Sequence, residues 1–402
     1  MKWPEAALGE IANLIRGITY KPSDVCDATT PSAVACMRTK NVQEVLDESD
    51  IVWIPASLIR NSSKYLNPGD ILVSSANSWN LVGKGCWVPE LKYPASAGGF
   101  ISILRGNPNT VDLRYLYHWF VSPQTQAKLR SYSNKTTNIS NLDHSRTLAT
   151  EIPLPPLEEQ RRIAAILDKA NQLRQLNQAN LQSLGDLARK VFSDMFGDPV
   201  DNERGWNSGC IGDFVAQFET GKSLGSGDGD VSDSLRIIRV SAVSSGSFKP
   251  EESKPAPKGY VPRENHFVQE GDLLFCRANT DMLIGEVAYV GQGVRDLLLS
   301  DKIWRFCWPN KSKSHALYVQ QLFRHPSVRR EIRRRATGTS GSMLNISQSS
   351  VLEIPIILPP ADLQNKFQDI AAECRRLFWQ NTRQAINLHL LSCSLNRSLL
   401  EN

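Results

Sequence analysis

The block Gly69-Asp70-Ile71-Leu72 returns as Gly271-Asp272-Leu273-Leu274, about 200 residues further along the same chain. Glu151-Ile152-Pro153 returns as Glu353-Ile354-Pro355 at the same offset, and other short blocks recur in the same order. A repeat of this length predicts two copies of one folded module, because each copy carries the same local signals. Two similar modules give two similar surfaces. We therefore expect a protein that grips a target which itself has two parts.

Length and composition predict a globular protein with more than one domain. A chain of 402 residues is too long for one ordinary hydrophobic core. Its 41% hydrophobic and 22% charged residues are a usual composition for a globular protein. No apolar run reaches membrane-spanning length, and Met1-Lys2-Trp3-Pro4 does not resemble a signal peptide, so we expect a cytoplasmic protein without membrane contact. The eight cysteines and six histidines lie without ligand spacing, which argues against a zinc site and a disulfide framework.

Positive charge is concentrated in one segment of the second half. The net charge of +5 with a pI near 8.7 is only mildly basic and does not by itself indicate nucleic-acid binding. On a helix, residues 329, 330, 333 and 334 share one face, which either neutralises phosphates or is a solvated helix surface. The segment contains Arg324, Arg329, Arg330, Arg333, Arg334 and Arg335.

Each copy of the repeat consists of a β-rich module followed by a long helix. Short apolar runs broken by Gly, Pro, Asn and Ser indicate strands with a few helices. Pro155-Pro156 and Pro359-Pro360 then precede acidic residues, and proline at the entry with acids in the first turn begins a helix. We expect the first helix to end near Phe196 and the second to run from about Pro360 towards Leu400.

Heptad-like spacing predicts that the two long helices pack as an antiparallel coiled coil, although a plain core helix has the same spacing. The apolar residues at this spacing form a stripe along each helix. Polar residues such as Asn177 and Asn381 interrupt the two stripes and would set the register of the helix pair. Because the stripe is expected to be buried, Leu173→Ala or Leu187→Ala should each cost about 2–5 kcal/mol. The first stripe comprises Ile163, Ile166, Ala170, Leu173, Leu184, Leu187 and Val191, and the second Phe367, Ile370, Cys374, Leu377, Leu388, Leu391 and Leu395.

The predicted fold class is α+β, with two similar β-rich recognition domains, two long helices and a pseudo-two-fold internal repeat. We expect the first recognition domain to span 1–153 and the first spacer helix 154–200. The second recognition domain then spans 201–355 and the second spacer helix 356–402.

The junction after the first module closely resembles a known hinge. Glu151-Ile152-Pro153-Leu154-Pro155-Pro156-Leu157-Glu158-Glu159-Gln160-Arg161-Arg162-Ile163 resembles the hinge between recognition domain and conserved helix in specificity subunits of Type I restriction–modification enzymes. Met195-Phe196-Gly197-Asp198-Pro199, followed by Gly205-Trp206, resembles the same family. The resemblance covers the whole chain. The second hinge departs from it, because Ala361-Asp362-Leu363-Gln364-Asn365 replaces the usual Leu-x-Glu-Gln.

The resemblance implies that each module reads one half of a split sequence in double-stranded DNA. The helix pair would set the distance between the half-sites and dock two methyltransferase subunits. Restriction/translocase subunits would complete a complex for phage defence. S-adenosylmethionine, ATP and Mg are expected on those partner subunits, with no cofactor on this chain.

No catalytic motif is visible in the chain. An Asn-Pro-Pro-aromatic sequence, which would hold a flipped base for methylation, is absent. Gly221-Lys222-Ser223 resembles the end of a phosphate-binding loop but lacks the earlier glycine that such a loop requires. We therefore expect a targeting subunit without an activity of its own.

Loops that the repeat presents twice are the best candidates for DNA contact, because Arg suits guanine and Asn or Gln suits adenine. Arg38 and Arg239 have a second interpretation, as strand residues that pair with a carboxylate. The first-half candidates are Arg38, Lys40, Asn77, Trp79, Asn80, Lys84, Lys135 and Asn138. The second-half candidates are Arg239, Arg277, Asn279, Lys302, Arg333, Arg334, Thr339 and Ser340.

The two copies differ where specificity should lie, which predicts two different half-sites. Ser75 in the first copy corresponds to Arg277 in the second, and Lys84 corresponds to Glu286. Three other functions fit parts of the pattern: the recognition part of a fused restriction enzyme, a structural coiled-coil adaptor, and a bipartite transcriptional regulator that works alone. A catalytic motif would favour the first, salt-independent DNA binding the second, and tight specific binding without methyltransferase the third.

Overall fold

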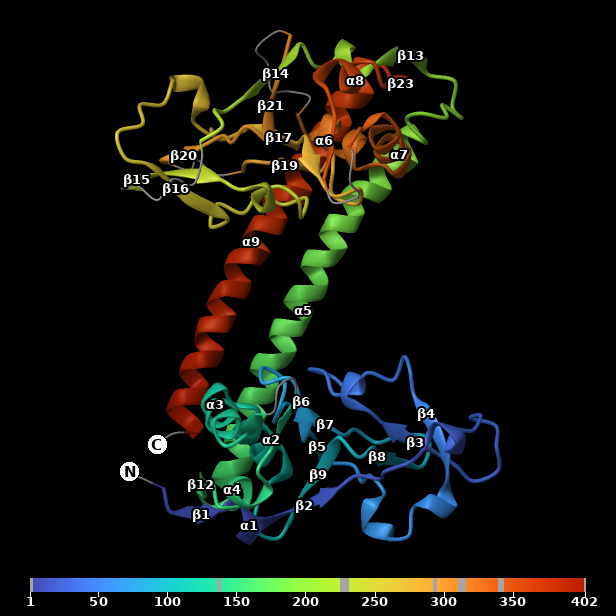
Figure 1. Cartoon of the computed structure of the whole chain (residues 1–402), viewed down its shortest axis with the longest axis vertical. Helices are drawn as coiled ribbons and strands as arrows, with labels where there is room; N and C mark the ends of the chain where they lie inside the picture. Colours follow the sequence, from blue (N-terminus) through green and yellow to red (C-terminus); the bar gives the residue numbers. More distant parts are fainter. Residues whose placement is uncertain are drawn as a thin grey trace. The chain divides into compact units, whose positions relative to one another are not determined.

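A computed structural model describes residues 3–135, 139–224, 231–291, 295–309, 316–338 and 343–400. The chain divides into two compact units, residues 1–177 with 384–402 and residues 178–383 (Figure 1). The two predicted long helices are confirmed as α5 (Leu157–Phe196) and α9 (Ala361–Leu400), each beginning just after a Pro-Pro pair. Both helices contribute to both units. The predicted domain boundaries at 153, 200 and 355 stay a prediction.

The first unit is built on a four-stranded sheet of order β2-β9-β5-β7, in which all neighbours are antiparallel. A three-stranded sheet of order β4-β3-β8 adds one parallel pair, β3 with β8. Helices α2 and α3 cover the four-stranded sheet, and the buried aromatic residues of α2 join its core together with Leu129 of α3. The elements of this unit before α5 are β1 (Glu5–Ala7), α1 (Leu8–Ile11), β2 (Ala12–Arg16), β3 (Ala33–Met37), β4 (Val52–Pro55), β5 (Ile71–Ser74), β6 (Ala76–Asn77), β7 (Gly85–Trp87), β8 (Ala95–Ala97), β9 (Ile101–Gly106), α2 (Leu113–Val121), α3 (Pro123–Ser131), β10 (Asn134–Lys135), β11 (Ser140–Asn141), α4 (His144–Leu148) and β12 (Glu151–Pro153).

The second unit repeats this strand order. Its four-stranded sheet is β14-β21-β17-β19, and its three-stranded sheet β16-β15-β20 again contains one parallel pair, β15 with β20. Helices α6 and α7 take the place of α2 and α3 along the chain. The elements between α5 and α9 are β13 (Asn207–Cys210), β14 (Gln217–Thr220), β15 (Val231–Ile238), β16 (Ser253–Pro257), β17 (Leu273–Cys276), β18 (Ala278–Asn279), β19 (Val287–Tyr289), β20 (Leu297–Leu298), β21 (Ile303–Cys307), α6 (Ala316–Arg324), α7 (Pro326–Arg335), β22 (Leu344–Asn345), α8 (Gln348–Leu352) and β23 (Pro355–Leu358).

The repeated Gly-Asp block forms a turn that leads into an inner strand of each main sheet. In the first unit, Gly69 has a φ of +93°, a conformation that glycine adopts without steric penalty. Asp70 is 2% exposed and accepts a hydrogen bond from the backbone N of Asn67 at 2.7 Å. Arg105 on β9 donates to both carboxylate oxygens of Asp70, at 2.8 and 2.6 Å, and to two backbone carbonyls. The block therefore serves a buried ion pair that joins two strands.

The second copy of the block has the same role. Gly271 has a φ of +83°, Asp272 is 4% exposed, and Arg305 on β21 donates from Nε to Asp272 Oδ2 at 2.8 Å. Arg305 also lies 3.3 Å from a carboxylate oxygen of Glu219. Because a buried charge without a partner is costly, both copies of the fold require the aspartate. This requirement gives a physical reason for the repeat in the sequence.

Each unit contains a packed segment of both long helices. In the first unit, Ile163 and Leu167 near the start of α5 share a buried cluster with Leu400 at the end of α9. In the second unit, Phe192 and Phe196 near the end of α5 share a buried cluster with residues near the start of α9, among them Phe367. These apolar side chains leave water on folding, which stabilises the junction of module and helices in each unit.

The predicted helix stripes are wrong at three leucines. Leu173 and Leu187 on α5 are 41% and 45% exposed, and Leu391 on α9 is 52% exposed. A straight α-helix has 3.6 residues per turn, whereas the apolar positions of a heptad recur on average every 3.5 residues. The side of the helix that is packed therefore drifts away from the heptad positions along its length. Asn177 and Ala188 are buried on α5 instead. The cost of 2–5 kcal/mol expected for truncating Leu173 or Leu187 therefore loses its basis, because it applies to buried leucines.

Within the described ranges, no helix is both long and apolar enough to cross a membrane. The same residues contain no group of three or more His, Cys, Asp and Glu side chains that is arranged to hold a metal ion.

Candidate nucleic-acid interface

In the first unit, three short strands bring two predicted contact segments together. Strand β6 pairs with β11, and β11 pairs with β10, so that Asn77 lies opposite Ser140 and Ser140 lies opposite Lys135. Asn138, which falls between β10 and β11 in sequence, lies outside the described residues. The structure describes the backbone of Lys135 and not its side chain. Segments about 60 residues apart in sequence thus form one surface, as the repeated loops predict.

The second unit builds the equivalent surface from β18 and β22. Asn279 lies opposite Leu344, and the backbone groups of Thr337 and Asn345 exchange two hydrogen bonds of 2.8 Å. The predicted contacts Thr339 and Ser340 fall between these residues in sequence and lie outside the described residues.

The two asparagines that the repeat places at these surfaces both hold their own turn. Asn77 Oδ1 accepts from the backbone N of Ser78 at 2.8 Å, and Asn279 Oδ1 accepts from the backbone N of Thr280 at 2.8 Å. Asn77 Nδ2 also donates to Ser74 Oγ at 3.0 Å. An amide has two N–H donors and two acceptor lone pairs, so each side chain keeps capacity for a base. Their contact with DNA stays a prediction.

The matched arginines Arg38 and Arg239 differ in their surroundings. Arg38 forms an ion pair of 3.0 Å with Asp50, which Lys40 also contacts, so the carboxylate interpretation holds for Arg38. The hydrogen bond from Lys40, together with these charges, lowers the pKa of Asp50. Arg239 is exposed and has no ion pair within the described part of the chain. Arg239 is therefore the more accessible of the two cations.

Three further first-half candidates lie between β6 and β7, whereas Arg277 directly precedes β18 and Lys302 directly precedes β21. Trp79 is 45% exposed and Asn80 is exposed, whereas Lys84 Nζ donates to Gln43 Oε1 at 2.7 Å. In the second unit, Arg277 Nε donates to the carbonyl of Asp301 at 2.7 Å, and its guanidinium lies 5.9 Å from the ring centre of Trp304. The Lys302 carbonyl accepts a hydrogen bond from the backbone N of Arg277, so these two candidates are neighbours.

The arginine run on α7 does not form one phosphate-binding face, and the interpretation that included Arg329 is wrong. Arg329 is 6% exposed, pairs with Glu286 at 3.1 Å, and donates to the carbonyls of Ile284 and Met282 at 2.6 and 2.8 Å. Gln126 holds the equivalent turn in the first unit through the carbonyl of Gly83 at 2.9 Å. Arg329 is thus a structural side chain, because a helical wheel does not show which face another element covers.

The remaining arginines of the run differ in exposure. Arg334 is exposed and pairs with Glu331 at 2.8 Å, Arg333 is half-buried, and Arg330 is exposed. A surface ion pair such as that of Arg334 is easily exchanged for a phosphate, because it is worth little in water. Arg333 and Arg334 stay predicted contacts, and the exposed Arg330 joins them.

Sequence reasoning missed Phe100, which is 63% exposed on the turn before β9. Its carbonyl accepts hydrogen bonds from the backbone N of Ser75 at 2.8 Å and of Ala76 at 3.2 Å, beside the strand that carries Asn77. Phe100 occupies the place that Lys302 has in the second copy, so the repeat itself contained the signal. An exposed aromatic ring among polar loops is a candidate for packing on a base or sugar.

Comparison with known proteins gives a consistent result. Residues 1–185 match the family described as the Type I restriction modification DNA specificity domain. The EcoKI specificity subunit of a Type I restriction enzyme from Escherichia coli strain K12 is 25% identical over 392 residues, covering 90% of this chain and 80% of that protein. The StySPI specificity subunit from Salmonella potsdam is 23% identical over 374 residues, covering 89% of this chain and 79% of that protein.

Two solved structures share the fold. The S subunit of a Type I restriction–modification system from M. genitalium superposes with a TM-score of 0.61 at 13% identity, covering 100% of this chain and 96% of that one. A chain from work on complex assembly and conformational transition of the type I R-M system superposes with a TM-score of 0.54 at 14% identity, covering 99% of this chain and 97% of that one.

Proposed function

We propose that this chain, which carries a Type I restriction modification DNA specificity domain in residues 1–185 and is related to Type I specificity subunits, selects the DNA sequence for such an enzyme. It acts as a targeting subunit and performs no catalysis. S-adenosylmethionine, ATP and Mg belong to its methyltransferase and restriction/translocase partners.

One observation carries this proposal: the same strand order is used twice, and each copy pairs an Asn-containing strand with a later short strand. In the first unit these are the strands of Asn77 and of Ser140–Asn141, and in the second those of Asn279 and of Leu344–Asn345. Repetition of the framework gives two surfaces of one shape. A target with two parts, such as a bipartite DNA sequence, is the natural partner of such a pair.

Differences between the two surfaces support two different half-sites. Phe100 in the first copy corresponds to Lys302 in the second, and a paired Arg38 corresponds to an exposed Arg239. Hydrogen-bond donors and aromatic rings select different base edges, so unequal side chains on equal frameworks read unequal sequences. The recognised sequence is therefore expected to be asymmetric.

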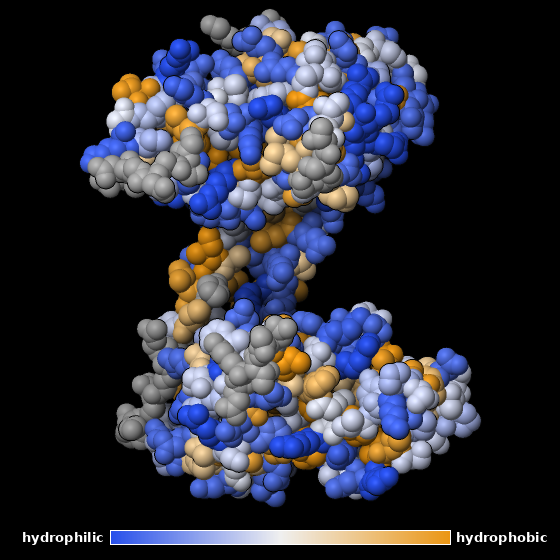
Figure 2. Space-filling model, in the orientation of Figure 1, coloured by the Kyte–Doolittle hydropathy of each residue, from blue (hydrophilic) through white to orange (hydrophobic). Residues whose placement is uncertain are grey.

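The helices supply the spacer and the docking surface in this proposal. The start of α5 packs with the end of α9 in the first unit, and the end of α5 packs with the start of α9 in the second. This order supports an antiparallel pair, whose length sets the number of unread bases between the half-sites. Exposed apolar side chains on these helices support docking of methyltransferase, because such side chains mark interaction sites (Figure 2). They are Leu173, Leu176, Leu187, Ile386, Leu390 and Leu391.

The test is to co-express the chain with its methyltransferase and to map adenine methylation across the genome. One asymmetric motif with two half-sites and a fixed spacer is expected. A stable complex that methylates nothing would contradict sequence targeting. Failure to form any complex would favour the structural adaptor instead.

Variants assign the half-sites to the units. Arg239→Ala should change or weaken one half-site while the other is read as before, whereas Arg263→Ala, another exposed arginine of the second unit, should change neither. A base contact is worth about 1–3 kcal/mol of discrimination, so the change should be visible as methylation of new sites. Uniform weakening over all sites would make Arg239 a phosphate contact.

A further inference from the structure

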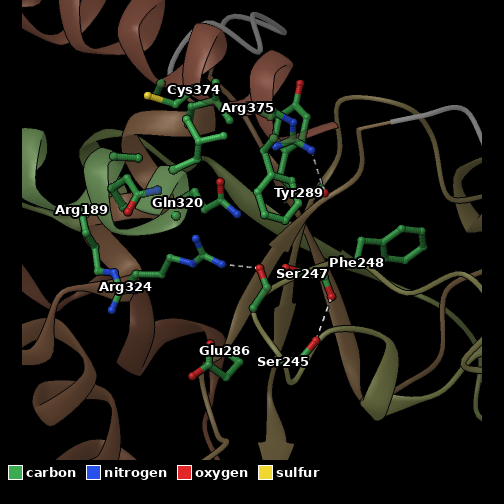
Figure 3. Close-up of a pocket in the computed structure, with 18 of the residues that line it drawn as sticks. Arg189, Ser245, Ser247, Phe248, Glu286, Tyr289, Gln320, Arg324, Cys374 and Arg375 are labelled. Carbon is green, nitrogen blue, oxygen red and sulfur yellow. Dashed lines mark hydrogen bonds between the residues drawn. The ribbon is translucent and has the colours of Figure 1, made fainter. Parts of the chain in front are cut away.

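The second unit contains a cavity of about 400 Å³ that the proposed DNA surface does not use (Figure 3). Its walls come from the end of α5, the loop around Gly246, strand β19, helix α6 and the first half of α9. A hollow of this size is in the range of small-molecule sites. Sequence inspection does not find it, because its walls come from segments far apart along the chain.

The cavity has an excess of positive charge. Four arginines line it together with a single carboxylate, that of Glu286. Glu286 pairs with Arg329 at 3.1 Å, and Arg189 pairs with Asp186 at 2.8 Å. The other two arginines, Arg324 and Arg375, form no ion pair with any described residue.

Arg324 and Arg375 are held by carbonyl groups, which leave most of their donors free. Arg324 Nη2 donates to the carbonyl of Gly246, and Arg375 Nη2 donates to the carbonyl of Tyr289 at 3.2 Å. The Arg375 guanidinium also lies 3.7 Å from the ring centre of Tyr289. A guanidinium has five N–H donors in a rigid fork that matches the oxygens of phosphate or carboxylate. Gln320, 7% exposed, lines the same hollow and adds an amide donor (Figure 3).

Burial makes the charges of these two arginines unfavourable. It lowers the pKa of the Arg324 guanidinium, and the charge of Arg189 adds to this effect while Glu286 opposes it. Burial lowers the pKa of Arg375 to about 10, with a further contribution from the charge of Arg324. An anion bound between the arginines would relieve this cost, since opposite charges in a poorly solvated site attract strongly.

The equivalent hollow of the first unit has a carboxylate on its long helix. The equivalent cavity is lined by Trp87, which matches Tyr289, and by the same turns of the two long helices. There, Asp168 on α5 accepts from Arg114 Nε at 3.0 Å and from His118 Nε2 at 2.8 Å. The residue that corresponds to Asp168 in the second unit is Ala372.

The correspondence of Asp168 and Ala372 rests on structure as well as on sequence. Gln160 Nε2 donates to the carbonyl of Pro155 at 2.8 Å, and Gln364 Nε2 donates to the carbonyl of Pro359 at 2.7 Å. The same bond therefore fixes the start of α5 and of α9. Counting onward from it places Ala372 where Asp168 stands.

We propose that the cavity of the second unit is a binding site for an oxyanion, the phosphate or carboxylate group of a small ligand, held by Arg324 and Arg375. The equivalent cavity of the first unit is lined instead by the carboxylate of Asp168, which Arg114 and His118 hold. Glu286 remains with Arg329 when the ligand binds. The site is independent of DNA reading, so its failure would leave the proposed targeting role untouched.

The experiment is isothermal titration calorimetry of the full chain with inorganic phosphate, and separately with succinate, at constant ionic strength. Binding of either probe is expected, and the tighter one identifies the oxyanion class. Arg375→Gln should weaken binding by about tenfold or more, because it removes a charge-assisted fork. Arg376→Gln is the matched control: it removes the same charge from the next residue of α9, whose side chain is exposed and pairs with Glu373.

Two further variants keep the proposal falsifiable if Arg375→Gln folds poorly. Gly291→Ala would place a Cβ 2.5 Å from Arg375 Nη2 and push the guanidinium aside, which should also weaken binding. Arg324→Gln should weaken binding as well, because it removes the other guanidinium that lines the cavity. The proposal is overturned if the wild-type chain binds neither probe at millimolar concentration, or if Arg375→Gln and Arg376→Gln bind equally well.

Discussion

In the first unit a carboxylate on the long helix lines the cavity, whereas the equivalent helix position of the second unit has none. Asp168 holds Arg114 and His118 in the first, while Ala372 stands at its place in the second. The second cavity instead holds two arginines without ion pairs to described residues, contributed by α6 and α9. The comparison shows that charges on a repeated fold diverge where the fold itself does not need them.

Where the fold needs a charge, both copies keep it. The buried pairs Asp70 with Arg105 and Asp272 with Arg305 join equivalent strands in the two units. A buried ion pair is costly to break from one side, so neither partner can be lost alone. The framework is therefore constrained by its interior, and the cavities and loops are constrained by what they bind.

The largest difference in stability should appear where the helices meet the modules. Phe367 is fully buried, with ring centres of Phe192 and Phe196 at 5.4 and 5.7 Å, while the equivalent Ile163 is a smaller side chain in the buried cluster of the first unit. Phe367→Ala should lower the free energy of unfolding by about 3–5 kcal/mol and Ile163→Ala by about 2–3 kcal/mol. Urea unfolding measures both. Leu390→Ala, at a side chain 61% exposed, is the control and should change little. A smaller loss for Phe367→Ala than for Ile163→Ala would contradict the aromatic junction.

Much of this framework could be predicted from the sequence. Proline pairs and acidic first turns placed both long helices within a few residues, because these signals act locally. The repeat correctly indicated that both halves share one architecture. It could not indicate that Arg105 and Arg305 complete the Gly-Asp blocks, because each arginine comes from a strand more than 30 residues away and no local pattern marks it.

The candidate site was less predictable, for a related reason. Arg329 has the charge and spacing of a DNA contact, yet the turn around Ile284 covers it. Leu173 fits the heptad, yet it lies beside the packed stripe. Type and spacing of residues specify an element, whereas only the packed structure specifies which of its faces is free. The cavity of the second unit shows the same limit, since its two arginines lie about 50 residues apart in sequence.

The buried aspartates give the next prediction. The Arg305 side chain is 9% exposed and that of Arg105 is 23% exposed, so water can compensate Arg105 better if its partner is lost. Asp272→Ala should cost about 3 kcal/mol of unfolding free energy and Asp70→Ala about 1–2 kcal/mol. Breaking a buried ion pair commonly costs about 3–5 kcal/mol. The loss expected for Asp272→Ala lies at the lower end of this range, because Glu219, at 3.3 Å from Arg305, still offers the arginine a carboxylate. Urea unfolding of the two variants checks this order. Equal losses would mean that exposure of the arginine does not matter.

A smaller effect separates the two cavities at acid pH. Burial opposes ionisation of Asp168, but hydrogen bonds and charges from His118 and Arg114 outweigh it and lower the pKa of Asp168 to about 2. A lowered pKa stabilises the folded chain above the unfolded value near 4, and this stability is lost as the pH falls towards about 2. Because Asp168 is 37% exposed, solvent screening reduces the contribution to about 1 kcal/mol or less.

The measurement for this effect is thermal unfolding between pH 5 and 2 for the wild type and for Asp168→Asn. The variant should lose less stability over this range than the wild type. Ala372→Asn, at the equivalent position of the second unit, is the control and should follow the wild type. Parallel curves for wild type and Asp168→Asn would show that the carboxylate contributes nothing beyond its hydrogen bonds.

The smallest change in stability should come from the exposed leucines of α5. Leu173→Ala in the first unit and Leu187→Ala in the second should each change the free energy of unfolding by about 0.5 kcal/mol or less, because both side chains remain largely in water. Leu167→Ala, at a leucine 2% exposed, should cost about 2–5 kcal/mol and serves as the buried reference. If Leu173→Ala costs as much as Leu167→Ala, then the packed stripe follows the heptad after all. Co-purification with methyltransferase tests whether these leucines form the proposed docking surface. Weaker capture by either exposed-leucine variant, at unchanged stability, would show that these side chains bind a partner.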